Sequence, residues 1–264
     1  GFQGKGFGNT DAIMACAKHF AAYGAAIGGR DYNAVDMSLN TLWDIYLPPF
    51  KAAAEAGAAT FMNSFNTLNG IPATGNAYLQ RDILKGMWNF KGFVVSDWNS
   101  IGEMIPHGFA KDNYDASFKA ITAGNDMDME SRSYIINLGK LVADNKVSFT
   151  LIDDAASGIL RKKLELGLFD DPYKFINPTR EKTALNRPEN QDIARDMAHK
   201  SMVLLKNDHQ ILPLSKQLKT VALIGPLVKA KKELKGFWSL DVDKNEDIPS
   251  LMDALQKQNP QTQY

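Results

Sequence analysis

Cysteine is almost absent from this sequence of 264 residues, because Cys16 is the only one. A single thiol excludes an intrachain disulfide and any zinc site built from cysteines. Charge of one sign is also lacking, since 30 basic residues face 30 acidic ones, whereas a general nucleic-acid surface or a polybasic membrane surface needs an excess of positive charge. The longest apolar run, Val221 to Val228, is too short to cross a bilayer. We therefore expect a globular protein with no membrane span and no nucleic-acid partner.

Several catalytic motifs are missing as well. The four histidines show no His-x-x-x-His spacing, and no Gly-x-Ser-x-Gly turn occurs. The stretch from Gly24 to Gly29 is rich in glycine, but it has neither the lysine and hydroxyl of a phosphate loop nor the glycine spacing of a dinucleotide site. We therefore expect no cofactor and no metal.

The first 166 residues alternate between short apolar runs and amphipathic stretches, a pattern that predicts parallel strands buried on both faces by helices. The apolar runs are 12–17, 58–62, 92–95 and 123–129, and the stretches with helical character are 36–46, 78–88, 115–122, 134–145 and 151–166. This gives about four strand–helix units, and a closed barrel needs eight. We predict an α/β fold in which residues 1–166 form half of a (β/α)8 TIM barrel.

The character of the sequence changes after Leu166. Residues 167–190 contain three prolines and predict an extended linker. A helix is expected at 191–205, a strand at 221–226 and another helix at 248–256. We predict that residues 191–264 are the beginning of a second α/β domain, because one or two strands cannot close a core alone.

Asp97 is the sharpest candidate for chemistry, because it comes directly after the apolar run that ends at Val95. A carboxylate in this position lies at the rim of the sheet and is held by a rigid element. A structural role is the alternative, since an aspartate there also caps helices or accepts hydrogen bonds from loop N–H groups. Trp98 beside it is either a stacking platform for a sugar ring or a core residue.

Lys18 and His19 follow the first apolar run and form the second candidate. An ammonium beside an imidazole supplies several hydrogen-bond donors for a polyol. A lysine stretched along the surface and a histidine bonded to a backbone carbonyl would explain the same pair without function. Asp126 and Asp128 alternate along the fourth predicted strand, so at most one of them faces a site.

Seven separate blocks of the sequence carry a further signal. They are Lys18–Gly24, Val35–Ser38, Pro48–Phe50, Leu68–Pro72, Lys91–Trp98, Gly167–Pro172 and Val203–Asn207. In these blocks, and in their order over nearly the whole chain, the sequence resembles glycoside hydrolase family 3, in particular its bacterial periplasmic β-glucosidase branch.

The resemblance implies a retaining β-glycosidase that hydrolyses terminal non-reducing β-D-glucosyl, or β-xylosyl, residues through a covalent glycosyl-enzyme intermediate. It implies that Asp97 is the nucleophile of that reaction. We also predict a set of side chains that bind the substrate, namely Lys18, His19, Trp98, Phe65, Arg30 and His107. The expected substrate is an oligosaccharide or an aryl or alkyl β-glycoside, and the branch implies a periplasmic or secreted protein.

The sequence departs from the family pattern in places. Many members have a tyrosine at the position of Phe65, whose hydroxyl can bond the nucleophile, and Phe65 cannot make that contact. The stretch from Ala21 to Gly24 lacks the histidine loop of the branch that cleaves N-acetylhexosaminides, so that activity is not expected.

The resemblance also places the acid/base glutamate beyond Tyr264 and the first barrel strands before Gly1. We therefore expect an internal fragment that holds the C-terminal half of the catalytic barrel, a linker and the start of an α/β sandwich domain, and that is inactive alone. Two alternatives remain open. One is a glycoside phosphorylase or transglycosylase with the same nucleophile, and the other is a non-catalytic carbohydrate-binding relic.

Overall fold

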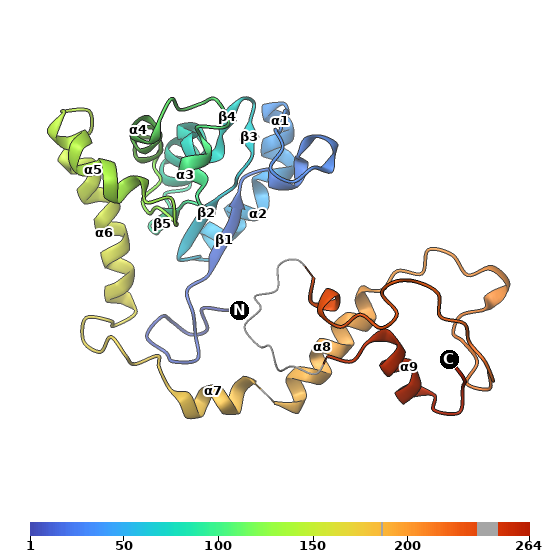
Figure 1. Cartoon of the computed structure of the whole chain (residues 1–264). Coiled ribbons are helices and arrows are strands. Elements are labelled where there is room, and N and C mark those ends of the chain that lie inside the picture. Colours follow the sequence, from blue (N-terminus) through green and yellow to red (C-terminus); the bar gives the residue numbers. More distant parts are fainter. Residues whose placement is uncertain (186, 237–247) are drawn as a thin grey trace. The chain divides into compact units, whose positions relative to one another are not determined.

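The protein has an α/β fold, seen in a computed structural model that describes residues 1–185, 187–236 and 248–264 (Figure 1). It divides into two compact units, Gly1–Arg180 and Glu181–Tyr264. The first unit contains the parallel sheet and the buried core, so it holds the elements that position the candidate site.

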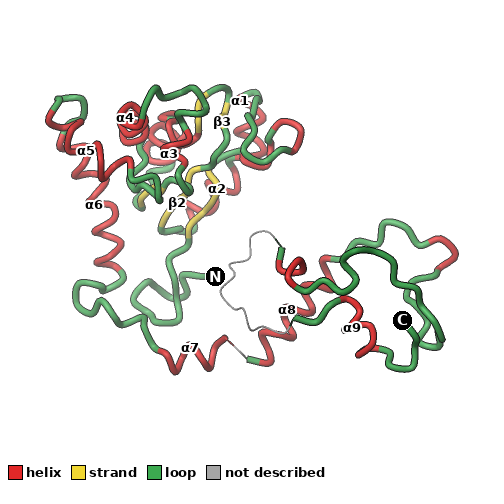
Figure 2. Tube along the Cα trace, viewed as in Figure 1, coloured by secondary structure: helices red, strands yellow, loops and turns green. Residues whose placement is uncertain are grey.

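The sheet of the first unit has three parallel strands in the order β1-β2-β5, which Figure 1 labels. Figure 2 draws the strands in yellow. Phe61 of β2 lies in register with Ala17 of β1 and with Val94 of β5. The bounds are Cys16–Phe20 for β1, Thr60–Asn63 for β2 and Phe93–Val95 for β5, while a separate antiparallel pair is formed by β3 (Thr67–Leu68) and β4 (Ile71–Pro72). Because β1, β2 and β5 run in the same direction, their carboxyl ends meet at one edge of the sheet.

Helices follow the strands along the chain. In the first unit they are α1 (Leu39–Thr41), which continues as a wider turn over Leu42–Tyr46, α2 (Pro48–Glu55), a helix over Tyr78–Met87, α3 (Ser100–Glu103), α4 (Asn113–Ala123), α5 (Ser133–Ala143) and α6 (Phe149–Glu165). Further along are α7 (Pro178–Leu185), α8 (Pro188–Ser201) and α9 (Leu251–Gln258).

The ends of the longer helices follow from local chemistry. The Asp112 side chain accepts the Asp115 N–H at 2.8 Å and so satisfies a free donor at the start of α4. The same helix ends at Gly124, whose φ of 106° favours a residue without a Cβ. Ser148 begins α6 in the same way, by accepting the Leu151 N–H.

Two clusters of buried side chains form the core of the first unit. The first joins the three strands through Phe20, Phe61 and Val94. The second packs α3, α4 and α5 together through Ile101, Met104, Ile121 and Leu141. Burial of these apolar side chains is the main force that holds the sheet edge in place.

Gly92 allows β5 to approach β2 closely. A Cβ at this position would lie 2.0 Å from the Ala59 carbonyl oxygen and 2.4 Å from the Phe90 ring. Both distances are far below van der Waals contact, so the space at Gly92 accepts no side chain.

The first strand starts later than the sequence predicts. Its predicted range was 12–17, but β1 spans Cys16–Phe20 and contains both Lys18 and His19. The partner strand explains the shift, because β2 begins at Thr60 and Thr60 pairs with Cys16. Before Cys16 there is no strand opposite, and the Ala15 N–H donates to the Gln3 side chain at 3.1 Å instead.

The fourth predicted strand, 123–129, is wrong for most of its length. Only one parallel bridge forms there, between Val95 and Met127. Part of the expected ladder is replaced by a side chain, since the Val94 N–H donates to Asp126 Oδ2 at 2.8 Å. The carboxylate thus satisfies a donor that a regular neighbouring strand would otherwise use.

In the second unit, the strand predicted at 221–226 is not formed, and the only bridge among its described residues joins Thr220 to Gln263. Ile224 is 93% exposed. The buried residues in the described part of this unit are Ser250 and Thr262, and both are polar. A strand without neighbouring strands is not stable, which explains why this apolar run forms none and leaves Ile224 exposed.

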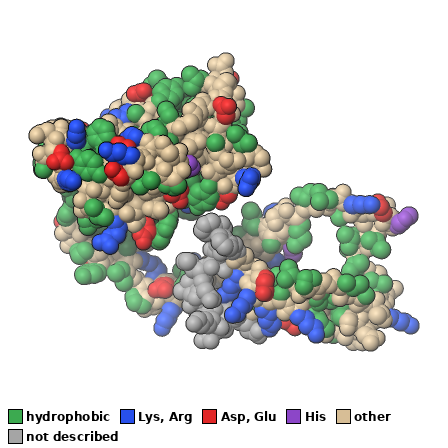
Figure 3. Space-filling view, turned by 45° about the horizontal axis from the view of Figure 1, so that its top comes forward, with side chains coloured by type: hydrophobic (Ala, Val, Ile, Leu, Met, Phe, Trp, Pro, Cys, Tyr) green, Lys and Arg blue, Asp and Glu red, His purple; other side chains and the backbone are tan. Residues whose placement is uncertain are grey.

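Basic, acidic and hydrophobic side chains are interspersed over the face of the first unit that Figure 3 draws. This arrangement fits the balanced charge of the sequence. Among the described helices, none combines the length and the hydropathy that a membrane span requires.

Candidate active site at the carboxyl edge of the sheet

Asp97 lies two residues after the end of β5, at the carboxyl edge of the sheet. The Trp98 N–H donates to Asp97 Oδ1 at 2.7 Å, and the Ser100 N–H donates to the Asp97 carbonyl oxygen at 3.1 Å. The residue is only 7% exposed. Within the described residues, its other carboxylate oxygen, Oδ2, is buried and accepts no hydrogen bond. Buried polar atoms without a partner are rare in proteins. Seven such side-chain atoms occur among the described residues, and Asp97 Oδ2 is the one that belongs to a carboxylate.

The segment around Asp97 is fixed by hydrogen bonds to the chain after α4. The Ser96 N–H donates to the Met127 carbonyl at 2.8 Å, and the Met129 N–H donates to Ser96 Oγ at 2.8 Å. The Asn99 N–H donates to the Met129 carbonyl at 2.9 Å. These bonds hold the backbone on both sides of Asp97, so the direction of its carboxylate is set before any ligand binds.

His19 is the side chain that faces the free oxygen. Its Nε2 lies 3.3 Å from Asp97 Oδ2. Burial lowers the pKa of His19 below its usual range, and the charge of Lys18 acts in the same direction, while Asp97 and Asp31 oppose them. At neutral pH the imidazole is therefore uncharged, with one ring N–H available as a donor.

Tyr23 packs against His19 from the loop after β1. The two rings make an edge-on contact with their centroids 5.1 Å apart. The Tyr23 hydroxyl donates to Asp31 Oδ1 at 2.5 Å, and the same oxygen accepts the Tyr32 N–H at 3.1 Å. Burial and this bond to Asp31 raise the pKa of Tyr23 well above its usual range, so the hydroxyl keeps its proton.

Phe65 joins the loop after β1 to the region after β2. Its ring centroid lies 4.4 Å from that of Tyr32 and 5.9 Å from that of Tyr23. The buried Phe65 ring thus anchors both tyrosines of the loop. Tyr32 has a φ of 64°, a left-handed backbone conformation that these ring contacts and the bond to Asp31 help to maintain.

Glu103 is a second carboxyl group in electrostatic contact with the site. It is half-buried at the end of α3, and burial raises its pKa, with the negative charge of Asp97 as a further cause. Glu103 in turn raises the pKa of Tyr32, after the larger effect of burial. Burial thus makes Glu103 harder to ionise than a carboxyl group in water.

The structure brings some of the predicted residues together and leaves others apart. Lys18 is exposed, and its charge acts on His19. Trp98 is 62% exposed beside Asp97, so the alternative that it belongs to the core is wrong. Arg30 is exposed and His107 is half-buried, and in the described part of the chain no ion pair or hydrogen bond joins either side chain to Asp97.

Asp126 and Asp128 have structural partners. Asp126 forms an ion pair with Lys85 at 2.5 Å besides accepting the Val94 N–H. Asp128 accepts hydrogen bonds from the Ser131 hydroxyl and the Tyr134 N–H. Their carboxylate oxygens are thus used in holding the fold together. Over the ranges that the structure describes, no three His, Cys, Asp or Glu side chains come close enough together to hold a metal ion.

The sequence alone did not identify Tyr23, Asp31, Tyr32 or Glu103. The one available signal was the position of the first three, which lie in or beside the glycine-rich loop that follows a strand. Nothing in the sequence distinguished Glu103 from a solvated helix residue. Its proximity to Asp97 comes from the single turn of α3 that follows β5.

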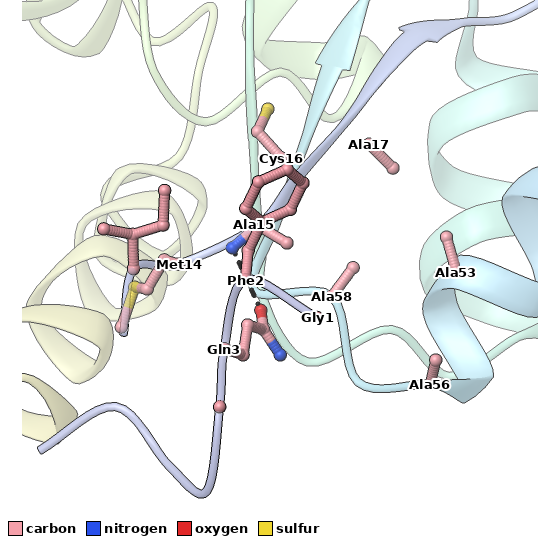
Figure 4. Close-up of a pocket in the computed structure, with 12 residues that line it drawn as sticks. Gly1, Phe2, Gln3, Met14, Ala15, Cys16, Ala17, Ala53, Ala56 and Ala58 are labelled. Carbon is pink, nitrogen blue, oxygen red and sulfur yellow. Dashed lines mark hydrogen bonds between the residues drawn. The ribbon is translucent and has the colours of Figure 1, made fainter. Parts of the chain in front are cut away.

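A cavity of about 580 Å³ lies elsewhere, at the amino end of β1 (Figure 4). Figure 4 shows Phe2, Gln3 and Cys16 around it, together with Ala53 of α2 and with Ala56 and Ala58 from the segment between α2 and β2. No carboxylate is among its lining residues. Because it contains neither an acid nor Asp97, we place the candidate site at the carboxyl edge and not in this cavity.

The comparisons with known proteins point to one family. The sequence matches the profile "Glycosyl hydrolase family 3 N terminal domain" over residues 1–162, which is more than half of the chain. It also matches "Glycosyl hydrolase family 3 C-terminal domain" over residues 202–263.

Among curated proteins, a periplasmic β-glucosidase of Salmonella typhimurium is 41% identical over 256 residues, covering 94% of this chain and 33% of that protein. A putative β-xylosidase of Formosa agariphila is 38% identical, covering 87% of this chain and 31% of that protein. Among solved structures, a mutant β-glucosidase from Listeria innocua in complex with laminaribiose has a TM-score of 0.80 at 40% identity, covering 89% of this chain and 33% of that chain. The chain thus spans about one third of the length of these relatives.

Proposed function

The chain belongs to glycosyl hydrolase family 3, and on that premise we propose that it is the nucleophile-bearing part of a retaining β-glycosidase. The observation that carries the proposal is Asp97 Oδ2, a buried carboxylate oxygen at the carboxyl edge of a parallel sheet with no hydrogen-bond donor among the described residues. The relatives named β-glucosidase and β-xylosidase support terminal β-D-glucosyl or β-xylosyl residues as the sugar that is removed. The laminaribiose complex of a related enzyme supports an oligosaccharide as one class of substrate, beside aryl and alkyl β-glycosides.

We propose that residues 1–166 are the C-terminal half of a (β/α)8 TIM barrel. Three parallel strands with following helices support this, as does the parallel bridge that adds Met127 to the sheet. Residues 167–190 would be a linker, although the prediction that this linker is extended is wrong over Pro178–Leu185, which forms α7. Residues 191–264 would be the beginning of an α/β sandwich domain. The match of residues 202–263 to the C-terminal domain of the family supports the latter assignment.

The proposed reaction has two displacement steps. In the first, Asp97 attacks the anomeric carbon, the bond to the leaving oxygen breaks, and that oxygen takes a proton from a general acid. In the second, water attacks the same carbon and loses a proton to the group that served as acid, and the bond to Asp97 breaks. We assign the general acid to no residue of this chain.

The side chains around Asp97 would bind the sugar in this reaction. Lys18 and the neutral His19 offer N–H donors to hydroxyl groups, and the exposed Trp98 offers a flat apolar face to a pyranose ring. Phe65 offers a ring without a hydroxyl, so the nucleophile receives its contacts from the Trp98 N–H and from His19. We also propose a periplasmic or secreted location, which the name of the Salmonella relative supports.

The experiment that tests the proposal traps the covalent intermediate. The longest natural form of the protein that contains this chain is incubated with a 2-deoxy-2-fluoro-β-glucoside, and the labelled peptide is mapped by mass spectrometry. We expect the label on Asp97, and we expect Asp97→Asn to lose the label and at least about a thousandfold in kcat. Asp44→Asn removes an exposed carboxylate outside the site and serves as the matched control with normal labelling.

A label on another residue would refute Asp97 as the nucleophile. Normal turnover in Asp97→Asn would refute it as well. The same assay with inorganic phosphate separates hydrolysis from phosphorolysis, because a phosphorylase would release a sugar phosphate in place of the free sugar.

A further inference from the structure

We propose that Asp31 is a positioning residue of the candidate active site and acts on His19 through Tyr23. The inference rests on the proposed function, since it assigns a role in the same site. Asp31 lies in the loop between β1 and α1 and has no direct contact with Asp97. Three successive contacts between side chains link the two carboxylates.

The first link joins the imidazole to the nucleophile, with His19 Nε2 3.3 Å from Asp97 Oδ2. The second is the edge-on contact of the His19 and Tyr23 rings, whose centroids are 5.1 Å apart. The third is the hydrogen bond from the Tyr23 hydroxyl to Asp31 Oδ1 at 2.5 Å. Each link is a direct contact, so a change at Asp31 reaches Asp97 without any shift of the sheet.

Among the described residues no hydrogen bond fixes the ring of His19, so its orientation depends on its contacts with Tyr23 and Asp97. Within the described residues, neither imidazole nitrogen takes part in a hydrogen bond, and the contact with Asp97 lies outside hydrogen-bond geometry. Histidines at functional sites are usually oriented by a hydrogen bond to the second ring nitrogen. Here packing against the edge of Tyr23 replaces that bond, so the orientation of His19 depends on the orientation of Tyr23.

Asp31 is built to hold Tyr23 in one place. Its Oδ1 also accepts the N–H of the next residue, Tyr32, at 3.1 Å, which fixes the carboxylate relative to its own backbone. The loop is closed by the Ile27 N–H, which donates to the Ala34 carbonyl at 3.0 Å, and by the Asn33 side chain, which donates to the Ile27 carbonyl at 2.9 Å. A carboxylate on a closed loop is a rigid acceptor even where it is exposed.

The test is a double-mutant cycle in the longest natural form of the protein. We expect Tyr23→Phe and Asp31→Ala each to lower kcat/KM for an aryl β-glucoside by about tenfold, the factor that corresponds to roughly 1.4 kcal/mol. The double variant should lose about tenfold and not about a hundredfold, because both changes break the same link. Asp31→Asn removes the charge but keeps an acceptor oxygen for the Tyr23 hydroxyl, so its kcat/KM should stay within about threefold of that of the unmodified protein. If the charge of Asp31 were what mattered, this variant would lose as much kcat/KM as Asp31→Ala.

Tyr114→Phe is the matched control, since Tyr114 donates to Asp144 at 2.7 Å in a bond of the same kind on α4. It should leave kcat/KM unchanged. Additive losses in the cycle, or no loss in Tyr23→Phe, would overturn the proposal.

A crystal structure of Tyr23→Phe gives a result that does not depend on turnover. We expect the His19 ring to rotate away from Asp97. A ring that keeps its Nε2 at the present 3.3 Å from Oδ2 would overturn the positioning role. If the unmodified protein neither cleaves an aryl β-glucoside nor is labelled by the fluoroglucoside, the proposed function fails. The crystal structure of Tyr23→Phe alone then decides whether Asp31 positions His19.

Discussion

Trp98 and Asp97 are neighbours in the sequence and differ in almost every physical respect. The carboxylate is buried and accepts one backbone hydrogen bond, from the Trp98 N–H, whereas the indole is mostly exposed. A large exposed aromatic side chain next to a buried acid contributes little to folding and is available to a ligand. The indole belongs to neither core cluster, and a role in binding a sugar stays our prediction for it.

We expect Trp98→Ala to raise KM for a β-glycoside by about tenfold, which is the upper end for one aromatic contact. The melting temperature should stay unchanged, because the side chain is 62% exposed and takes no part in either core cluster. Steady-state kinetics and thermal unfolding of the same variant check both statements. A lower melting temperature with an unchanged KM would assign Trp98 to the fold.

The state of His19 predicts how stability changes with pH. Burial lowers the pKa of His19 in the folded protein below 6.5, the ordinary value. Between the pKa of His19 in the folded protein and its ordinary value of 6.5 in the unfolded chain, the unfolded chain binds more protons than the folded one. The free energy of unfolding therefore falls as the pH is lowered through this range. We expect the loss of stability that is due to His19 to begin near pH 6.5 and to end below the pKa of His19 in the folded protein.

Urea unfolding at several pH values measures this effect. His19→Gln should show a shallower decline of the unfolding free energy over that window. An equally steep decline in the variant would show that other groups cause it.

At the scale of the elements, the spacing between β2 and β5 depends on Gly92. We expect Gly92→Ala to lower the free energy of unfolding by about 1–3 kcal/mol, as overpacked positions do. The reason is the 2.0 Å that would separate its Cβ from the Ala59 carbonyl oxygen. Urea unfolding should show a lower midpoint with an unchanged slope.

Gly139, within α5, is the matched control for this substitution. A Cβ there would have no atom within 4 Å. Gly139→Ala should leave stability unchanged or raise it by about 0.5–1 kcal/mol, since alanine favours a helix. Equal losses at both positions would mean that the close approach at Gly92 is not the cause.

The sequence was sufficient to predict the elements whose hydrophobic pattern is local. The apolar runs at 58–62 and 92–95 overlap β2 and β5, and the helical spacing at 115–122 and 151–166 matches α4 and α6. The prediction from the sequence failed where the pairing of strands sets the bounds of a strand. The first strand, β1, starts at Cys16 because that is where Thr60 of β2 lies opposite. The prediction failed again at 123–129, where the carboxylate of Asp126 takes a donor that a strand would use.

The candidate site shows the same division. Asp97 and His19 could be predicted because they lie at strands that the sequence reveals. Asp31 and Glu103 could not, since their contacts depend on how a loop and a single helical turn fold back.

At the scale of the whole molecule, the two units differ in how much apolar surface they bury. The first has two clusters of buried side chains, whereas the described part of the second buries only Ser250 and Thr262. Resistance to local opening follows buried contacts. We expect amide hydrogen exchange of the 264-residue chain to be slowest at β2 and β5 and close to the unprotected rate over residues 202–236.

Mass spectrometry of short peptides after deuterium exchange distinguishes the two regions. Peptides from α4 serve as an internal control, because this helix packs into the second core cluster. Strong protection over 202–236 would contradict the expectation and would mean that this region has a core of its own.

The unpartnered oxygen of Asp97 has a consequence for how this sequence can change. A carboxylate that is buried beside a histidine and receives no hydrogen bond on one oxygen is a burden on the folded state. Selection for thermal stability alone would therefore tend to replace it, and the role that we propose for Asp97 as nucleophile is what would keep it. A descendant freed from that role should lose this acid early, while Gly92 and the packed strands beneath it persist.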